Sequence, residues 1–198
     1  LCRQERAGVN MADSYSRIHN GNKIGVFTMQ HGPGAENAFG GVAQAYADNV
    51  PVLLIPGGST ESRVGVHPGF DAVPNYQHVT KWAARIESVQ RIPEMVSRAF
   101  THLKHGRPGP VLLELPSDVG SADVPGDIEE YQPVKTYKSC ASTEDVRDIM
   151  TALLKADKPM ISAGQGTLYA EATDDLVELS ELVNIPVMTT LAGKSAFP

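Results

Sequence analysis

The chain has 198 residues, of which 41% are hydrophobic and 20% are charged, and its formal net charge is −6. This mildly acidic balance, without basic clusters, argues against nucleic acid or an anionic membrane as a partner. The longest apolar runs have the length of a strand and are too short to cross a bilayer.

The first 116 residues alternate between predicted helices and strands. Periodic apolar residues and Gly or Pro breaks give this order: helix 5–18, strand 23–28, helix 35–48, strand 51–55, loop 57–74, strand 79–84, helix 93–105, strand 109–115. The strand at 51–55 is apolar throughout, as in strands covered on both faces, and 109–115 reads as a further buried strand. The alternation therefore predicts an α/β fold with a parallel sheet covered by helices.

Residues 117–142 are rich in Pro, Gly, Ser and acidic side chains and predict a linker. The pattern then restarts in a second unit over 143–198: helix 143–156, strand 159–163, turn 164–166, helix 170–183, strand 186–190. This second unit has only 56 residues, which is too few to complete an α/β domain. We therefore expect a truncated Rossmann-like domain and a chain that is a piece of a longer polypeptide.

Residues able to carry chemistry gather around the first strand, although each has a purely structural explanation. Glu5 opens the first helix, where the helix dipole favours an acid. Gly32-Pro33-Gly34 suits a tight strand-to-helix turn and lacks the pattern of a phosphate-binding loop. Asn37 is placed to cap its own helix, and His31 precedes the turn. Cys2 and Cys140 are far apart, which predicts no disulfide or metal site and a cytoplasmic protein.

Motifs along practically the whole chain resemble thiamine-diphosphate-dependent enzymes of the acetolactate synthase-like family. They occur in the family's order: Glu5, Ala12-Asp13-Ser14-Tyr15-Ser16-Arg17, Gly32-Pro33-Gly34-Ala35-Glu36-Asn37, Ala45-Tyr46-Ala47-Asp48, Pro51-Val52-Leu53-Leu54-Ile55, Gly106-Arg107-Pro108-Gly109-Pro110, Glu114-Leu115-Pro116, Ala163-Gly164-Gln165-Gly166 and Ile185-Pro186-Val187-Met188-Thr189-Thr190. The resemblance implies a pyrimidine-binding domain over 1–116, lacking its first elements, and the start of the central domain over 143–198.

The resemblance also implies roles for individual residues. Glu5 would be catalytic, hydrogen-bonding N1′ of the cofactor's aminopyrimidine ring and favouring its imino tautomer. Gly32, Pro33, Gly34 and Asn37 would bind the cofactor, and His31 is a possible substrate contact. The implied cofactors are thiamine diphosphate and Mg²⁺, both held mainly by a further domain, while FAD occurs in some members only. The implied substrate is a small 2-keto acid such as pyruvate, and the implied assembly is a homodimer or tetramer.

Two features leave alternatives open. Biosynthetic acetolactate synthases usually carry Phe-Gln-Glu where this chain has Phe70-Asp71-Ala72, so another acyl donor, such as oxalyl-CoA or sulfoacetaldehyde, is an alternative. The second alternative is a non-catalytic nucleotide-binding or assembly module. Gly164 and Gly166 suggest a dinucleotide fingerprint, but Tyr169 replaces its third glycine. We expect this chain by itself to be inactive.

Overall fold

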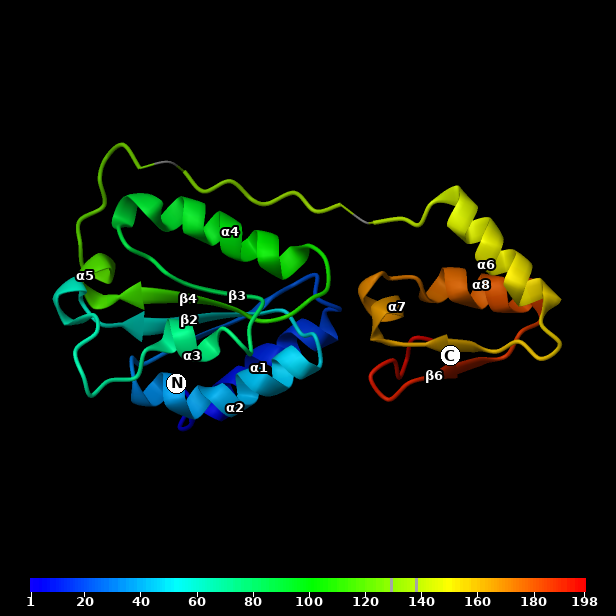
Figure 1. Cartoon of the computed structure of the whole chain (residues 1–198), viewed down its shortest axis with the longest axis horizontal. Helices are drawn as coiled ribbons and strands as arrows, with labels where there is room; N and C mark the ends of the chain where they lie inside the picture. Colours follow the sequence, from blue (N-terminus) through cyan, green and yellow to red (C-terminus); the bar gives the residue numbers. More distant parts are fainter. Residues whose placement is uncertain (129, 138) are drawn as a thin grey trace. The chain divides into compact units, whose positions relative to one another are not determined.

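The computed structural model describes residues 1–128, 130–137 and 139–198. The chain forms two compact units, Leu1–Thr136 and Tyr137–Pro198, which are described separately (Figure 1). Residues 129 and 138, inside the predicted linker, lie outside the described residues.

The first unit is an all-parallel sheet with helices on both faces, which confirms the predicted α/β fold. Its strands are β1 (Gly25–Met29), β2 (Val52–Gly58), β3 (Trp82–Arg85) and β4 (Val111–Pro116), paired in the order β1-β2-β4-β3. Its helices are α1 (Glu5–Ile18), α2 (Pro33–Ala47), α3 (Ala72–Tyr76), α4 (Ile92–Lys104) and α5 (Ser117–Gly120), with 3-10 turns at Glu61–Arg63 and Val89–Arg91.

Two predicted boundaries were wrong. The second strand was expected to end at residue 55, but β2 continues to Gly58 because Gly57 and Gly58 pair with the last two residues of β4. The segment 57–74 was expected to be a loop, but it ends in the start of α3, whose buried Tyr76 packs with the α2 side of the core. Both features depend on tertiary contacts.

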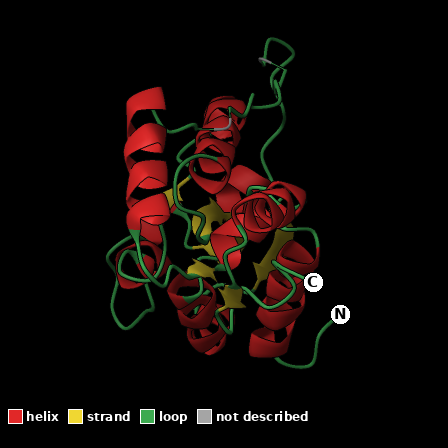
Figure 2. Ribbon diagram, turned by 90° about the vertical axis from the view of Figure 1, so that its right-hand side faces the viewer, coloured by secondary structure: helices red, strands yellow, loops and turns green. Residues whose placement is uncertain are grey.

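Alternate residues of the central strands feed two separate apolar layers. Val52 and Leu54 join the cluster formed with α1, α2 and α3, whereas Leu53 and Val111 join the cluster formed with α4. Figure 1 shows α4 on one side of the sheet and α1 with α2 on the other, and Figure 2 colours the helices red and the strands yellow. Burial on both faces explains why these strands are apolar at most positions, with Glu114 in β4 as the exception.

Helix α1 packs directly onto β1 and runs antiparallel to it. A Cβ atom at Gly25, the first residue of β1, would lie 2.0 Å from the carbonyl oxygen of Ala12, and one at Gly8 would lie 2.1 Å from the ring of Phe27. The glycines are therefore required for this close approach. Ala12 lies beside Gly25 at the start of β1, and Gly8 lies beside Phe27, farther along β1. Glu5, at the N-terminus of α1, therefore lies toward the carboxyl end of β1.

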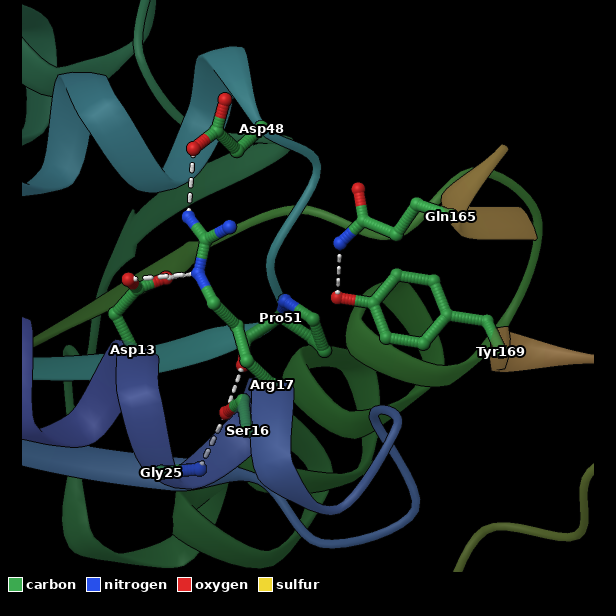
Figure 3. A network of polar contacts seen from close by, with 8 residues as sticks. All are labelled: Asp13, Ser16, Arg17, Gly25, Asp48, Pro51, Gln165 and Tyr169. Carbon is green, nitrogen blue, oxygen red and sulfur yellow. Dashed lines mark hydrogen bonds and ion pairs between the residues drawn. The ribbon is translucent and has the colours of Figure 1, made fainter. Parts of the chain in front are cut away.

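A polar network joins the opposite ends of the same elements (Figure 3). Arg17 Nε lies 3.0 Å from Asp13 Oδ2, and its Nη2 lies 2.7 Å from Asp48 Oδ2. Ser16 Oγ donates to the carbonyl of Pro51 at 2.6 Å and accepts from the amide of Gly25 at 2.8 Å. The Ala-Asp-Ser-Tyr-Ser-Arg and Ala-Tyr-Ala-Asp motifs therefore tie α1 and α2 together at the amino edge of the sheet, away from Glu5.

Tyr76 links α3 to the first turn of α2. Its hydroxyl donates to the carbonyl of Ala35 at 2.5 Å, and burial raises the pKa of this fully buried phenol.

Replacing Tyr76 with Phe removes the hydroxyl but keeps the ring, so we expect the free energy of unfolding to fall by about 1 kcal/mol. Urea unfolding measures this, with Y46F at an exposed position of α2 as the control. Equal stability of Y76F and wild type would contradict the expectation.

The second unit consists of helices α6 (Thr143–Lys155), α7 (Gln165–Tyr169) and α8 (Thr173–Val183) with parallel strands β5 (Ile161–Ala163) and β6 (Val187–Thr189). The turn predicted over 164–166 was wrong, because residues from Gln165 onward form α7. Gln165 Nε2 donates to the hydroxyl of Tyr169 at 2.9 Å across one turn of this helix (Figure 3). Within the part of the chain that the structure describes, no helix is both long and apolar enough to span a bilayer.

Candidate functional site

The carboxyl edge of the first sheet contains a cavity of about 350 Å³. Parallel strands all end at this edge, so the loops after β1, β2 and β3 and the end of β4 meet there. The cavity is lined by His31 after β1, Ser59 after β2, Arg85 at the end of β3 and Glu114 in β4, together with residues of the segment 63–74. In a parallel α/β sheet this edge is the usual place for a ligand.

Arg85 and Glu114 form the polar floor of this cavity. They are register neighbours on β3 and β4, and Arg85 Nη1 lies 2.7 Å from Glu114 Oε1. Arg85 Nη2 donates to the backbone carbonyl of Ser59. The Glu114 side chain lies against Gly58 of β2, where a Cβ atom would be only 2.6 Å from Glu114 Oε1. The absence of a side chain at Gly58 therefore makes room for Glu114. The pair is therefore fixed by three adjacent strands.

Glu114 is 2% exposed, and its burial raises the pKa of its carboxyl group. Arg85 and His31 act in the opposite direction by favouring the carboxylate, while the negative charge of Asp71 adds to the raising effect. Burial is the largest cause, because desolvation disfavours the charged form.

This raised pKa predicts a pH dependence of stability. The folded state holds the Glu114 proton more tightly than the unfolded state, so its stabilising contribution is complete below the ordinary value of 4.5 and is lost as pH rises through the raised pKa. We expect the stability of wild type relative to E114Q to fall across this range. Urea unfolding of both proteins from pH 4 to pH 8 measures the difference in their free energies of unfolding. An advantage of wild type over E114Q that rises with pH would contradict the prediction.

His31 connects the cavity to the Gly-Pro-Gly turn. Its Nε2 atom lies 3.1 Å from Ser59 Oγ, whereas its Nδ1 atom is buried and has no hydrogen-bond partner among the described residues. The imidazole is thus held at one nitrogen only. Buried polar atoms without partners are rare in native proteins, so this atom is a candidate for a further hydrogen bond.

The Gly-Pro-Gly turn begins α2 with a special backbone conformation. Gly32 has φ +68° and ψ −105° at the N-cap position, where glycine is favoured, and Pro33 follows in the first turn. Gly34 is buried, and a Cβ atom there would lie 3.0 Å from the Cβ of Gln30. Gly32 is also buried, but among the described residues nothing apart from its chain neighbours lies within 4 Å of the corresponding position. The positive φ of Gly32 therefore accounts for glycine here, rather than a close contact with another segment.

The structure brings most of the predicted site residues to one edge of the sheet. Glu5 is half-buried at the start of α1, which reaches the carboxyl end of β1, where His31 and Gly32 follow. Pro33 and Asn37 are exposed in the first turns of α2. Asn37 was also considered as a helix cap, but the N-cap position belongs to Gly32. Binding of a cofactor by these residues stays a prediction.

Comparison with known proteins identifies the two parts of the chain. Residues 1–83 match the family model of the thiamine pyrophosphate enzyme N-terminal TPP binding domain, and residues 146–198 match that of the thiamine pyrophosphate enzyme central domain. The chain belongs to the thiamine pyrophosphate enzymes. This confirms the predicted family and its domain order.

Relatives match along the whole chain. It is 34% identical to a probable acetolactate synthase large subunit of Methanocaldococcus jannaschii, 32% identical to glyoxylate carboligase of Escherichia coli O157:H7 and 31% identical to the acetolactate synthase large subunit of Haemophilus influenzae, each over 100% of this chain. The matched part makes up 34%, 34% and 35% of these relatives. The chain thus spans about a third of their length.

Three polar residues of the cavity, Ser59, Arg85 and Glu114, were not predicted as site residues. Ser59 lay in an expected loop, Arg85 just beyond an expected strand, and Glu114 was noted only as part of a family motif. One signal was present, since Glu114 interrupts the apolar run 111–115, and a buried acid needs a partner. Its partner Arg85 is 29 residues away, so the pair required the strand order.

Proposed function

We propose that this chain is part of an enzyme that uses thiamine diphosphate to decarboxylate a small 2-keto acid and to join the resulting acyl unit to an acceptor, as an acetolactate synthase does. The observation that carries the proposal is the half-buried Glu5 at the same sheet edge as the Gly32-Pro33-Gly34 turn. The names of two relatives, acetolactate synthase large subunits, support the reaction class.

The residues of this chain fit the pyrimidine end of the cofactor. When bound, thiamine diphosphate supplies the carbon centre that attacks the keto group and then stores the electron pair left by CO₂. Glu5 is proposed to hold a proton at N1′ of the pyrimidine, which is the general acid–base task of a single carboxylate. The Gly32–Gly34 backbone lets the ring approach, with Pro33 and Asn37 beside it.

Other components of the proposed enzyme belong outside these 198 residues. Mg²⁺ and the diphosphate group are proposed to bind in further parts of the polypeptide, and a homodimer or tetramer is the proposed assembly. FAD is a possible second cofactor whose presence a visible absorption spectrum of the purified protein would reveal. A cytoplasmic location is proposed from the two distant cysteines, both of which are free and exposed.

The donor substrate has a second candidate. Glyoxylate carboligase matches this chain about as well as the acetolactate synthases do, so glyoxylate is an alternative to pyruvate. Oxalyl-CoA and sulfoacetaldehyde are further acyl donors to test. A non-catalytic module of the same fold is the remaining alternative, and the position of Glu5 argues against it.

The proposal is tested on the complete polypeptide that contains this chain. CO₂ release is followed with pyruvate and, separately, with glyoxylate, in the presence and absence of added thiamine diphosphate and Mg²⁺. Release that depends on the cofactor supports the proposed function, and the better substrate identifies the donor. Cofactor binding measured by calorimetry, without CO₂ release from pyruvate, glyoxylate or oxalyl-CoA and without sulfite release from sulfoacetaldehyde, would favour the non-catalytic module.

A further inference from the structure

The cavity at the carboxyl edge has one polar side and one apolar side. The polar lining consists of His31, Ser59, Arg85 and Glu114 at the strand ends and of Arg63, His67 and Asp71 in the segment 63–74, and the apolar lining includes Val64, Val66, Phe70 and Val73. Its volume of about 350 Å³ is within the range of small-molecule sites. A small ligand with one polar end and one apolar end matches this lining.

Arg85 retains donors beyond those that hold it in place. A guanidinium has five N–H donors, of which one contacts Glu114 and another contacts the Ser59 carbonyl. These two contacts fix the plane of the group from two directions. A guanidinium held in this way is suited to a carboxylate, which it binds with strong, directional hydrogen bonds.

His31 supplies a second group at the same cavity. Ser59 Oγ contacts Nε2 and thereby limits the ring's rotation, while Nδ1 has no partner among the described residues. Arg85 in turn holds the backbone of Ser59. Direct contacts thus link Glu114 to Arg85, Arg85 to Ser59, and Ser59 to His31. At the end of this series, His31 Nδ1 has no hydrogen-bond partner among the described residues.

The charged side chains at the cavity limit the ligand's own charge. Glu114 offsets the charge of Arg85 at 2.7 Å, and the segment 63–74 adds one further charge of each sign, Arg63 and Asp71. The lining thus carries two cationic and two acidic side chains, which suits a ligand with a single charge better than one with two. A single carboxylate with a short apolar substituent is the best match.

We propose that this cavity binds the carboxylate of a monocarboxylic 2-keto acid through Arg85 and His31, with Ser59 as a positioning residue and the apolar lining receiving the acid's substituent. The identification of the acid as a 2-keto acid rests on the function proposed above. The recognition of a carboxylate rests on the cavity alone.

Direct binding in the absence of thiamine diphosphate tests the proposal on the complete polypeptide. Isothermal titration compares 2-oxobutanoate with 2-oxobutanamide, which has nearly the same shape but no charge. Wild type is expected to bind the acid at least about ten-fold more tightly than the amide, and H31Q and S59A are expected to lose most of this preference. Equal affinity of wild type for the two compounds, or a preference kept by both variants, would overturn the proposal.

Matched variants separate recognition from folding. His78 is exposed and outside the cavity, so H78Q should keep the wild-type preference. R85K retains the charge but loses the planar fork, and is expected to weaken acid binding while amide binding is unchanged. S59A removes only a hydroxyl, so its result stays interpretable even where a larger change at His31 or Arg85 impairs folding.

The binding result is independent of the turnover assay. An acid preference that needs His31 and Ser59, found in a protein without cofactor-dependent CO₂ release, would support the cavity as a carboxylate site and count against the proposed function. CO₂ release in a protein whose variants keep the full preference would support the function and overturn the role of the cavity.

Discussion

Replacing Glu5 with Gln is expected to lower cofactor-dependent CO₂ release by at least about two orders of magnitude, the usual effect of removing a general acid–base group. Gln preserves the size and the hydrogen-bonding shape of the side chain but cannot exchange a proton with N1′. The measurement is kcat for the preferred 2-keto acid in the complete polypeptide at saturating thiamine diphosphate and Mg²⁺.

The control for this prediction is another glutamate in the first turn of a helix. Glu144 occupies such a position in α6 and is exposed, so E144Q should retain wild-type turnover. Circular dichroism verifies that E5Q remains folded. Wild-type turnover in folded E5Q would remove Glu5 from the mechanism and leave only its favourable position at a helix N-terminus.

Replacing Arg85 with Met is expected to lower the free energy of unfolding by about 3 kcal/mol. The change leaves the carboxyl group of Glu114, 3% exposed in its side chain, without its partner in the core. The raised pKa of Glu114 shows that burial already opposes its ionisation in the presence of Arg85. Chemical unfolding at pH 7 provides the measurement.

A double-mutant cycle shows whether the pair itself causes the loss. In R85M/E114Q no buried charge is left, so this variant should be more stable than R85M alone. The Arg91–Glu87 pair on the surface serves as comparison, since both side chains are well exposed and R91M should change stability little. Equal losses of unfolding free energy in R85M and R91M would show that burial of the Arg85–Glu114 pair does not determine its contribution to stability.

The local sequence was sufficient for the longer elements and the family, but not for the short helices α3, α5 and α7. Helical spacing placed α1 at 5–18, where the structure has Glu5–Ile18, and the apolar runs placed the strands near their observed positions. These features follow from side-chain periodicity and turn chemistry, which act over a few residues. The spacing from Glu5 to the Gly-Pro-Gly turn was likewise visible in the sequence, because the motif depends only on one helix, one strand and one turn.

Only the tertiary structure determines where the cavity lies and which residues line it. His31, Ser59, Arg85 and Glu114 meet because parallel strands in the order β1-β2-β4-β3 all end at one edge. The sequence contained each residue, but neither the strand order nor the register that pairs Arg85 with Glu114. A buried charge is stable only beside a partner that the fold supplies, and that partner lies on another strand. Such contacts between distant segments become visible only once the sheet is assembled.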